Sequence, residues 1–323
     1  MKNKLKSFFT EHWKYFAVCT ACKLSLFDNL HEAKTANQLA KELSLNEDKL
    51  LLLLNALHHE GFLVKMNGCF ALNSLSAFLT ENNPESLKQA CLNWSEEHLI
   101  AWQNLDFSIR TGKSSFEKLY GLSFFDYLNE KPEKLHAYHK AMYQYAKDDY
   151  KTITDLIDFS KHKTVLDVGS GYGAILENVK MKNPNVECIL FDLEKVIENV
   201  SVSTIQKISG SFFEKIPIQT EAVILSRILH DWNDEKATII LKNCFEALSN
   251  NGILYVIENC VDKINIDLSL LSLNMTAMCE SYERTSMEYV TLSKNAGFHF
   301  ESETKLNELQ TILTFTKNEL ARD

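Results

Sequence analysis

A glycine-rich segment between a predicted strand and a predicted helix is the sharpest chemical signal in this sequence. It reads Val165-Leu-Asp-Val-Gly-Ser-Gly-Tyr-Gly173, and its glycines allow a tight turn and a close approach of the backbone to a ligand. Asp192 ends the next predicted strand, about 20 residues further on, where a carboxylate can accept hydrogen bonds from both hydroxyls of a ribose. The pattern predicts a cofactor that contains a nucleoside.

Two cofactor classes fit this loop. A dinucleotide site requires Gly-x-Gly-x-x-Gly/Ala, and Gly169, Gly171 and Ala174 satisfy it. An S-adenosylmethionine site has the form acid-x-Gly-x-Gly-x-Gly, which Asp167 and the three loop glycines match in full. The loop by itself leaves both open, so the choice depends on the rest of the chain.

A histidine at the end of another predicted strand is the second candidate chemical group. His230 lies in Leu225-Ser-Arg-Ile-Leu-His-Asp-Trp-Asn-Asp234, at the sheet edge where doubly wound folds bind ligands. An imidazole with a near-neutral pKa can take the proton of a phenol, which is a poor nucleophile until it is deprotonated. Glu258 and Glu283 can reach the same edge, and a carboxylate can orient an imidazole and stabilise its cation.

In combination, these segments resemble the S-adenosylmethionine-dependent O-methyltransferase family, which includes plant caffeate-type enzymes, acetylserotonin O-methyltransferase and bacterial polyketide-tailoring enzymes. The resemblance covers nearly the whole chain, and the His-Asp-Trp and Glu-Arg-Thr motifs are specific to it. The motifs that carry it are Gly169–Gly173, Gly210-Ser-Phe-Phe213, His230-Asp-Trp232, Val256-Ile-Glu258, Glu283-Arg-Thr285 and Ala296-Gly-Phe298. It implies an α/β protein: a C-terminal Rossmann-like class I methyltransferase domain with a mostly parallel doubly wound sheet, and a mainly helical N-terminal winged-helix dimerisation domain.

The resemblance also implies roles for individual residues. His230 is the expected base, flanked by Glu258 and Glu283, and Asp231 is expected to fix the substrate or the histidine. We expect S-adenosyl-L-methionine as the cofactor and no metal. The expected cofactor contacts are Asp167, Gly169, Gly171, Asp192, Leu193, Ser211, Phe212, Ser226, Arg227 and Trp232.

Two positions depart from the family pattern. Ser211 stands where the family usually has an aspartate that contacts the adenine, so charge assistance is lost there. Ser226 stands where many members have lysine. These departures keep open a member that binds the cofactor without transferring its methyl group, as a hydroxylase or pericyclase would. Methylation of nitrogen, sulfur or carbon instead of oxygen also stays open.

The acceptor pocket is expected between the domains. Tyr138 and Met142 are four residues apart on one predicted helix, hence on one face, and Asn274 and Met278 repeat that spacing. Methionine and aromatic side chains suit a flat apolar acceptor. The predicted pocket residues are Leu99, Trp102, Tyr138, Met142, Asn274 and Met278.

The elements that must position these groups change character along the chain. Apolar residues recur at helical spacing over 8–30, and capped helices are expected from Thr35 and Asn46. A hairpin around Asn67-Gly68 follows, which completes the pattern of a winged helix. Long helices are predicted over about 86–109 and 132–159.

From about residue 163, strands alternate with helices, which predicts a parallel sheet covered on both faces. Strands are expected at 164–168, 187–192, 205–209, 222–226 and 252–258. The expected domains are a dimerisation domain over 1–95, a helical linker over 96–160 and a cofactor-binding catalytic domain over 161–323. Apolar surface before residue 60 predicts a homodimer.

Composition excludes several classes of function. The 323 residues carry 34 Lys and Arg against 43 Asp and Glu, a net charge of −9, so nothing draws the chain as a whole to nucleic acid or anionic lipid. The helix at 46–60 is too acidic for a DNA-reading helix. No secretion signal or membrane span is evident, and the eight scattered cysteines suit a reducing cytoplasm. Cys19 and Cys22 are expected to be buried apolar residues.

Overall fold

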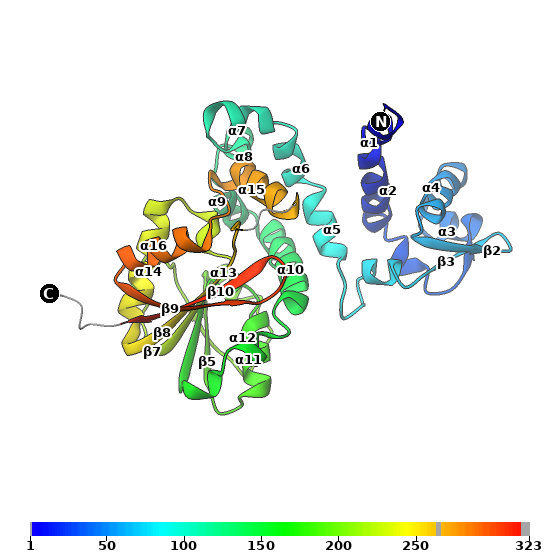
Figure 1. Ribbon diagram of the computed structural model, residues 1–323. Coiled ribbons are helices and arrows are strands. Elements are labelled where there is room, and N and C mark those ends of the chain that lie inside the picture. Colours follow the sequence, from blue (N-terminus) through cyan, green and yellow to red (C-terminus); the bar gives the residue numbers. More distant parts are fainter. Residues whose placement is uncertain (1, 263–265, 318–323) are drawn as a thin grey trace. The chain divides into compact units, whose positions relative to one another are not determined.

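The computed structural model describes residues 2–262 and 266–317, and the chain divides into two compact units at Leu99/Ile100. The first unit contains mostly helices and a small antiparallel sheet of order β1-β3-β2 (Figure 1). Its elements are α1 (Lys2–Phe8), α2 (Glu11–Lys23), η1 (Phe27–Asn29), β1 (Lys34–Thr35), α3 (Ala36–Glu42), α4 (Glu47–His59), β2 (Leu63–Met66), β3 (Cys69–Leu72), η2 (Ser76–Leu79) and α5 (Lys88–Trp94).

Local sequence explains the helix starts in this unit. Thr35 and Gln38 form the predicted capping box of α3, and the Asn46 side chain accepts from the Lys49 N–H at the start of α4. Asn67 and Gly68 both have positive φ values, 51° and 79°, as the tight turn between β2 and β3 requires. The predicted helix over 8–30 is shorter, since α2 ends at Lys23 and Ser25 takes a left-handed conformation with φ 53°.

The second unit is an α/β domain with a seven-stranded sheet. Its helices are α7 (Leu105–Thr111), α8 (Ser115–Tyr120), α9 (Phe124–Glu130), α10 (Pro132–Asp149), α11 (Ile153–Leu156), η3 (Phe159–Lys161), α12 (Ala174–Lys182), α13 (Glu194–Ile197), η4 (Leu229–Asp231), α14 (Asp234–Ala247), α15 (Ile266–Cys279) and α16 (Ser286–Asn295). Its strands are β4 (Thr164–Val168), β5 (Glu187–Asp192), β6 (Gln206–Ser209), β7 (Thr220–Ser226), β8 (Leu248–Asn259), β9 (Phe298–Lys305) and β10 (Gln310–Lys317). Helix α6 (Glu97–Trp102) spans the division between the units.

The strand order is β6-β5-β4-β7-β8-β10-β9. The first five strands are parallel, and β10 pairs antiparallel with both β8 and β9. The mostly parallel doubly wound sheet is therefore confirmed. The carboxyl ends of β4, β5, β7 and β8 meet at one edge, which is where such folds bind ligands.

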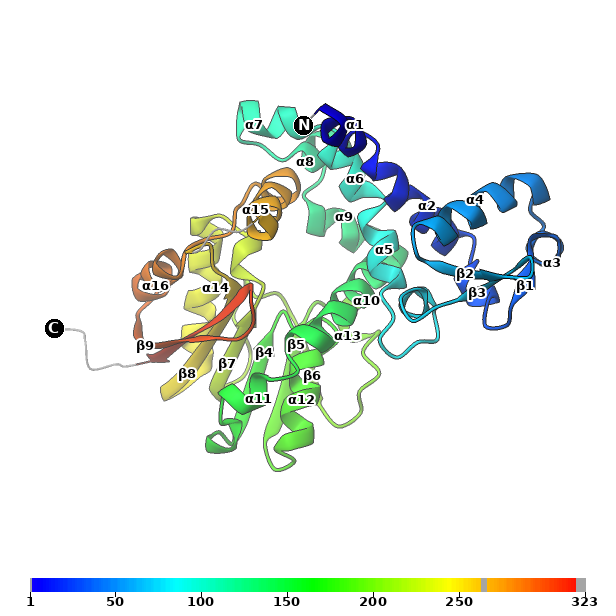
Figure 2. The same cartoon turned by 45° about the vertical axis from the view of Figure 1, so that its right-hand side comes forward.

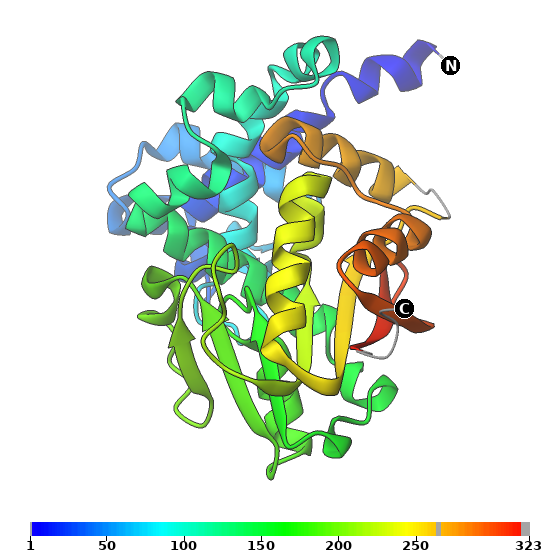
Figure 3. The ribbon, with the colours of Figure 1, turned by 90° about the vertical axis from the view of Figure 1, so that its left-hand side faces the viewer.

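Alternate residues of each strand face opposite sides of the sheet, and helices cover both. Leu166 and Val168 of β4 pack with α14 and α16, which lie in front of the strands in Figure 3. Val165 of β4 packs with α11 and α12, the green helices beside β4–β6 in Figure 2. Apolar burial on both faces leaves the polar groups of these strands concentrated at their ends.

Two expectations about helices are wrong, and one pair of strands is missing from the sequence prediction. The helix predicted over 86–109 is broken at Ser95 and at Asn104, whose side chains bond backbone carbonyls of the preceding turn and so compete with the helix. The helix predicted over 132–159 ends at Asp149, because Tyr150 turns inward and is 5% exposed. The antiparallel pair β9 and β10 was not predicted at all.

Candidate active site

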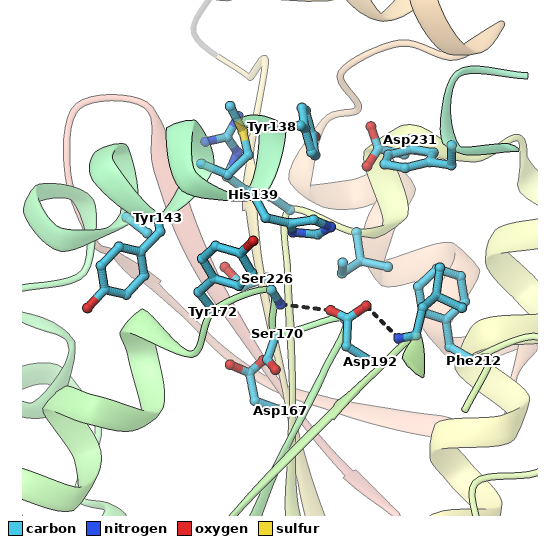
Figure 4. Close-up of a pocket in the computed structure, with 18 of the residues that line it drawn as sticks. Tyr138, His139, Tyr143, Asp167, Ser170, Tyr172, Asp192, Phe212, Ser226 and Asp231 are labelled. Atoms are coloured by element: carbon cyan, nitrogen blue, oxygen red, sulfur yellow. Dashed lines mark hydrogen bonds between the residues drawn. The ribbon is translucent and has the colours of Figure 1, made fainter. Parts of the chain in front are cut away.

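A cavity of about 310 Å³ opens at the carboxyl ends of the strands, wholly within the second unit. The glycine loop after β4 forms one side, and α10 contributes Tyr138, His139 and Tyr143 above the strand ends (Figure 4). The turn after β7 contributes His230 and Asp231.

Among the described residues, none of the helices has the length and apolar character that a bilayer-spanning helix needs.

The glycine loop requires glycine for two separate reasons. Gly169, Gly171 and Gly173 all have positive φ values, 72°, 54° and 84°, a region that other residues rarely adopt. A Cβ on Gly169 would also lie 2.5 Å from Cδ1 of Ile228, and one on Gly173 would lie 3.0 Å from Cδ1 of Leu190. The loop thus brings bare backbone to the cavity and starts α12 directly behind it.

Two carboxylates lie at the ends of β4 and β5, as predicted. Asp192 accepts from the Gly171 N–H at 2.8 Å and from the Leu193 N–H at 2.7 Å, one to each oxygen. Burial raises the pKa of Asp192 to about 6, although these two N–H groups oppose the rise. Burial and the nearby charge of Asp192 raise the pKa of Asp167 to about 8. Each Asp192 oxygen keeps a free lone pair for a ligand hydroxyl.

Aromatic rings build the wall next to Asp192. Phe212 and Phe213 each meet the Trp232 ring edge to face, with centroids 6.0 and 4.8 Å apart, and Phe125 lies against the same ring. The Ser211 hydroxyl accepts from the Phe213 N–H at 3.2 Å, which leaves its own proton available to a ligand. This wall offers apolar faces and one neutral donor in place of the family's aspartate.

Ser226, the last residue of β7, and Arg227, which follows it, also line the cavity. The Ser226 hydroxyl donates to the Tyr150 hydroxyl at 2.7 Å. Arg227 has φ 53°, and its Nη1 lies 4.0 Å from Oδ2 of Asp149. Its Nε is buried and has no hydrogen-bond partner among the described residues. A cation with an unused donor at the cavity suits an anionic group on a ligand.

His230 is held by a carboxylate, as the sequence predicts. Its Nδ1 lies 3.0 Å from Oε1 of Glu283, and its Nε2 lies 3.7 Å from Oδ1 of Asp231. Burial lowers the pKa of His230, but the charges of Glu283, Asp231 and Glu258 outweigh it and raise the pKa to about 10. The pKa of Glu283 is lowered despite its burial, because His230 faces it. The histidine is thus more basic than the near-neutral value expected from sequence.

Glu258 supports the turn rather than the imidazole. Its Oε1 accepts from the N–H groups of Ile228 and Leu229, at 2.9 and 2.8 Å, which fixes the start of η4. Glu258 is fully buried, and its pKa is raised to about 7. The hydrogen bonds therefore place Glu283 beside the ring and Glu258 beneath the backbone that carries it.

Arg284 holds the same turn from its other side. Its guanidinium donates to the carbonyls of Leu229 and Trp232, at 2.9 and 2.7 Å, and to the Asp234 carboxylate. Arg284 is 1% exposed. Adjacent residues, Glu283 and Arg284, thus fix the side chain and the backbone of the His230 turn.

The predicted acceptor residues are divided. Tyr138 and Met142 line the cavity. Three others lie elsewhere in the second unit: Trp102 donates to the side chain of Asn274 at 2.8 Å, and Met278 packs at 2% exposure among aromatic residues of α8 and α9. Leu99 belongs to the first unit and stays a prediction.

Two family models match this chain. Residues 102–299 match the O-methyltransferase domain, and residues 7–82 match the O-methyltransferase dimerisation domain. The chain belongs to the O-methyltransferase family. It is an S-adenosylmethionine-dependent O-methyltransferase with an N-terminal dimerisation domain.

Individual relatives agree over nearly the full length. The chain is 30% identical to phenazine O-methyltransferase PhzM of Lysobacter antibioticus over 304 residues, which is 90% of this chain and 89% of that protein. It is 29% identical to 3-amino-4-hydroxybenzoate 4-O-methyltransferase of Streptomyces cremeus, over 91% and 84% of the two chains. The crystal structure of LaPhzM has a TM-score of 0.93 at 28% identity, covering 98% of this chain and 99% of that one.

The cavity of this O-methyltransferase fits S-adenosylmethionine by its own chemistry. Asp192 offers free lone pairs for a ribose diol, the glycine loop leaves room for close approach, and the orphaned Nε of Arg227 can meet a carboxylate. The predicted contacts Leu193, Phe212 and Trp232 all line the same cavity. The residues present therefore match the parts of the cofactor.

Sequence reasoning missed several residues of this site. Asn259 donates to Glu283 at 2.9 Å, and Tyr150 bonds Ser226. Tyr172 of the glycine loop bonds Nδ1 of His136 on α10 at 2.7 Å. Tyr172 could have been noticed from its place between two loop glycines, whereas nothing in the sequence pairs Asn259 with a residue 24 positions away.

Proposed function

We propose that this enzyme methylates a phenolic hydroxyl of a small aromatic acceptor, with His230 as the general base. The observation that carries the proposal is the 3.0 Å pairing of His230 Nδ1 with Glu283, which leaves Nε2 for the cavity. The relatives named for phenazine and aminohydroxybenzoate methylation act on aromatic compounds. The Phe125, Tyr138 and Trp232 rings at this cavity suit a flat aromatic acceptor.

In this proposal, the cofactor is held by Asp167, Asp192, the glycine loop and Arg227, and it supplies a methyl group on a sulfonium. The chain's own part is to orient the acceptor and remove its proton. A pKa of about 10 for His230 lies close to that of a phenol, about 10, so transfer of the proton from the phenol to the neutral imidazole costs little energy. Glu283 then stabilises the imidazolium.

Two further parts of the proposal concern assembly and place. The dimerisation domain at 7–82 supports a homodimer, and Leu5, Phe8, Phe9 and Trp13, in and between α1 and α2, are each more than half exposed. Such a dimer is expected to bury more than about 2,000 Å². We further propose a cytoplasmic location, on the basis of the cysteines that stay unpaired among the described residues.

The test is a product analysis. The enzyme is incubated with S-adenosylmethionine and a panel of catechols, hydroxyphenazines and aminohydroxybenzoates, and the products are analysed by mass and by NMR. We expect a gain of one methyl group on oxygen, with loss of turnover in His230→Gln. Methylation on nitrogen, sulfur or carbon, or an unmethylated product with the cofactor intact, would contradict the proposal.

A further inference from the structure

Asn259 is buried at the end of β8, next to Glu258. Its Nδ2 donates to Oε1 of Glu283 at 2.9 Å, and this is the same oxygen that His230 Nδ1 meets at 3.0 Å. Asn259 is 3% exposed, and its backbone is fixed by pairing with Gln310 of β10. An amide and an imidazole therefore share one carboxylate oxygen.

We propose that Asn259 is a positioning residue for methyl transfer, which holds the Glu283 carboxylate so that Oε1 faces Nδ1 of His230. This inference rests on the proposed function, because it concerns the support of the same base. Asn259 itself is placed behind Glu283 and acts through it.

The other carboxylate oxygen explains why such a residue is needed. Oε2 of Glu283 is buried and has no hydrogen-bond partner within residues 2–262 and 266–317. The terminal torsion of a glutamate has a broad, two-fold profile, so a carboxylate with one partner can rotate away from it. A second donor on the rigid end of a strand selects a single orientation. Asn259 supplies that donor from the sheet, while His230 comes from a turn.

The charges around the pair explain why the donor is neutral. Several titratable or charged groups already interact electrostatically with His230, Glu283 or Asp231. They are Glu258, Arg227, Tyr138, Cys279 and Tyr289. A lysine at 259 would pair with Glu283 and compete with the imidazole. A carboxylate would add one more buried negative charge beside Glu258. An amide donates one hydrogen bond and leaves the charge balance unchanged.

The first experiment replaces the donor with an apolar side chain of similar size. We expect Asn259→Leu to lower kcat for a simple phenol about 10-fold, within the range that one hydrogen bond to a charged group provides. KM and the affinity for S-adenosylhomocysteine should stay near wild type. Thr220→Val is the matched control, because it removes a buried side-chain hydrogen bond at the far end of β7 and should leave kcat unchanged.

A second measurement separates positioning from a general structural effect. If Asn259 acts through the base, the ratio of wild-type kcat to variant kcat should approach one for a nitrophenol that is already ionised at the assay pH. A uniform loss across acceptors, or an unchanged kcat in a folded Asn259→Leu enzyme, would overturn the proposal. If Asn259→Leu does not fold, Asn259→Asp keeps the shape, and an unimpaired kcat there would overturn it equally.

The two proposals fail in different ways. A wild-type enzyme that methylates no phenol contradicts the proposed function. An active wild type with an unaffected Asn259→Leu variant contradicts the role of Asn259 alone.

Discussion

Asp167 and Asp192 of the glycine-loop region and Glu283 beside His230 are all buried carboxylates, but their surroundings shift their pKa values in opposite directions. Asp167 and Asp192 lie at the carboxyl ends of β4 and β5, and burial raises both of their pKa values, opposed at Asp192 by backbone N–H groups. Glu283 lies against His230, and its pKa is lowered. The Asp192 carboxylate keeps lone pairs that can accept hydrogen bonds from a ligand. The Glu283 carboxylate is already paired with His230 within the protein.

This difference predicts that Asp167 and Glu283 have opposite effects on stability and distinct effects on function. Removing an acid from the glycine-loop region should lower the affinity for the cofactor and remove the free-energy cost of burying a carboxylate. Removing Glu283, whose pKa is lowered, should affect the chemical step and destabilise the fold.

The largest effect is expected at His230. His230→Gln should lower kcat for a phenol by roughly 10²–10⁴, the usual contribution of a general base, and leave S-adenosylhomocysteine binding near wild type. Because the pKa of His230 is raised to about 10, kcat/KM of the wild type should rise from pH 7 to pH 9 as the imidazole loses its proton. Near-normal turnover of the variant at pH 9, where part of the wild-type imidazole is neutral, would show that the acceptor arrives ionised.

The next effect concerns Asp192. Asp192→Ala should lower the affinity for S-adenosylhomocysteine, measured by calorimetry, by about 10- to 100-fold, because hydrogen bonds to a carboxylate contribute about 1.5–3 kcal/mol each. The turnover at saturating cofactor should change little. Glu187→Ala, at the exposed start of the same strand, is the control, and equal affinities in the two variants would refute the assignment.

Glu283 should be stabilising. Glu283→Gln is expected to lower the free energy of unfolding by about 1–3 kcal/mol at pH 7. The pKa of Glu283 is lowered, so its contribution exists above the ordinary value of 4.5 and is lost as the pH falls. Denaturant melts at pH 7 and pH 4 should therefore differ, with the gap between variant and wild type smaller at pH 4.

Asp167 should behave in the opposite way. With a pKa of about 8, the folded protein keeps a proton that the unfolded chain releases above about pH 4, so stability falls as the pH rises between these values. Asp167→Asn removes that dependence and should raise Tm at pH 8 by about 2–4 °C. A lower Tm for the ligand-free variant at pH 8 would remove the contrast between the two regions.

The smallest effect is expected at Ser211. Ser211→Asp restores the acidic residue usual in the family and should raise the affinity for S-adenosylhomocysteine by about two- to fivefold, because the hydrogen bond gains charge assistance. Ser211→Ala, which removes the remaining hydroxyl, should move the affinity in the other direction. Identical affinities of all three proteins would mean that this side chain does not reach the cofactor.

The parts of the fold that local patterns encode could be predicted. The bounds of β4 and β5 match the sequence prediction, and the capping box at Thr35 forms as expected. The pairing of β9 with β10 could not be predicted from local signals. Its polar, half-exposed strand β9 lacks the apolar runs that mark the parallel strands.

The site shows the same division between local and distant information. The glycine loop and Asp192 lie within one strand-helix-strand unit, whose geometry follows from sequence spacing. The partners of Glu283 are Asn259 and His230, which lie 24 and 53 positions before it in the sequence. No spacing rule predicts that these segments come together. The relation of Trp102 to Asn274, 172 positions apart, is equally inaccessible to helical periodicity.

The two-sided grip of Glu283 and Arg284 on the η4 turn has a consequence for evolution and engineering. The supports of the base come from β8, η4 and the short segment before α16, whereas Tyr138 and Met142 come from α10. Under the proposed function, substitutions on α10 can change acceptor specificity while the residues that hold the proposed base stay unchanged. A designer who wants a new acceptor should randomise the cavity face of α10 and leave residues 228–234, 258–259 and 283–284 untouched.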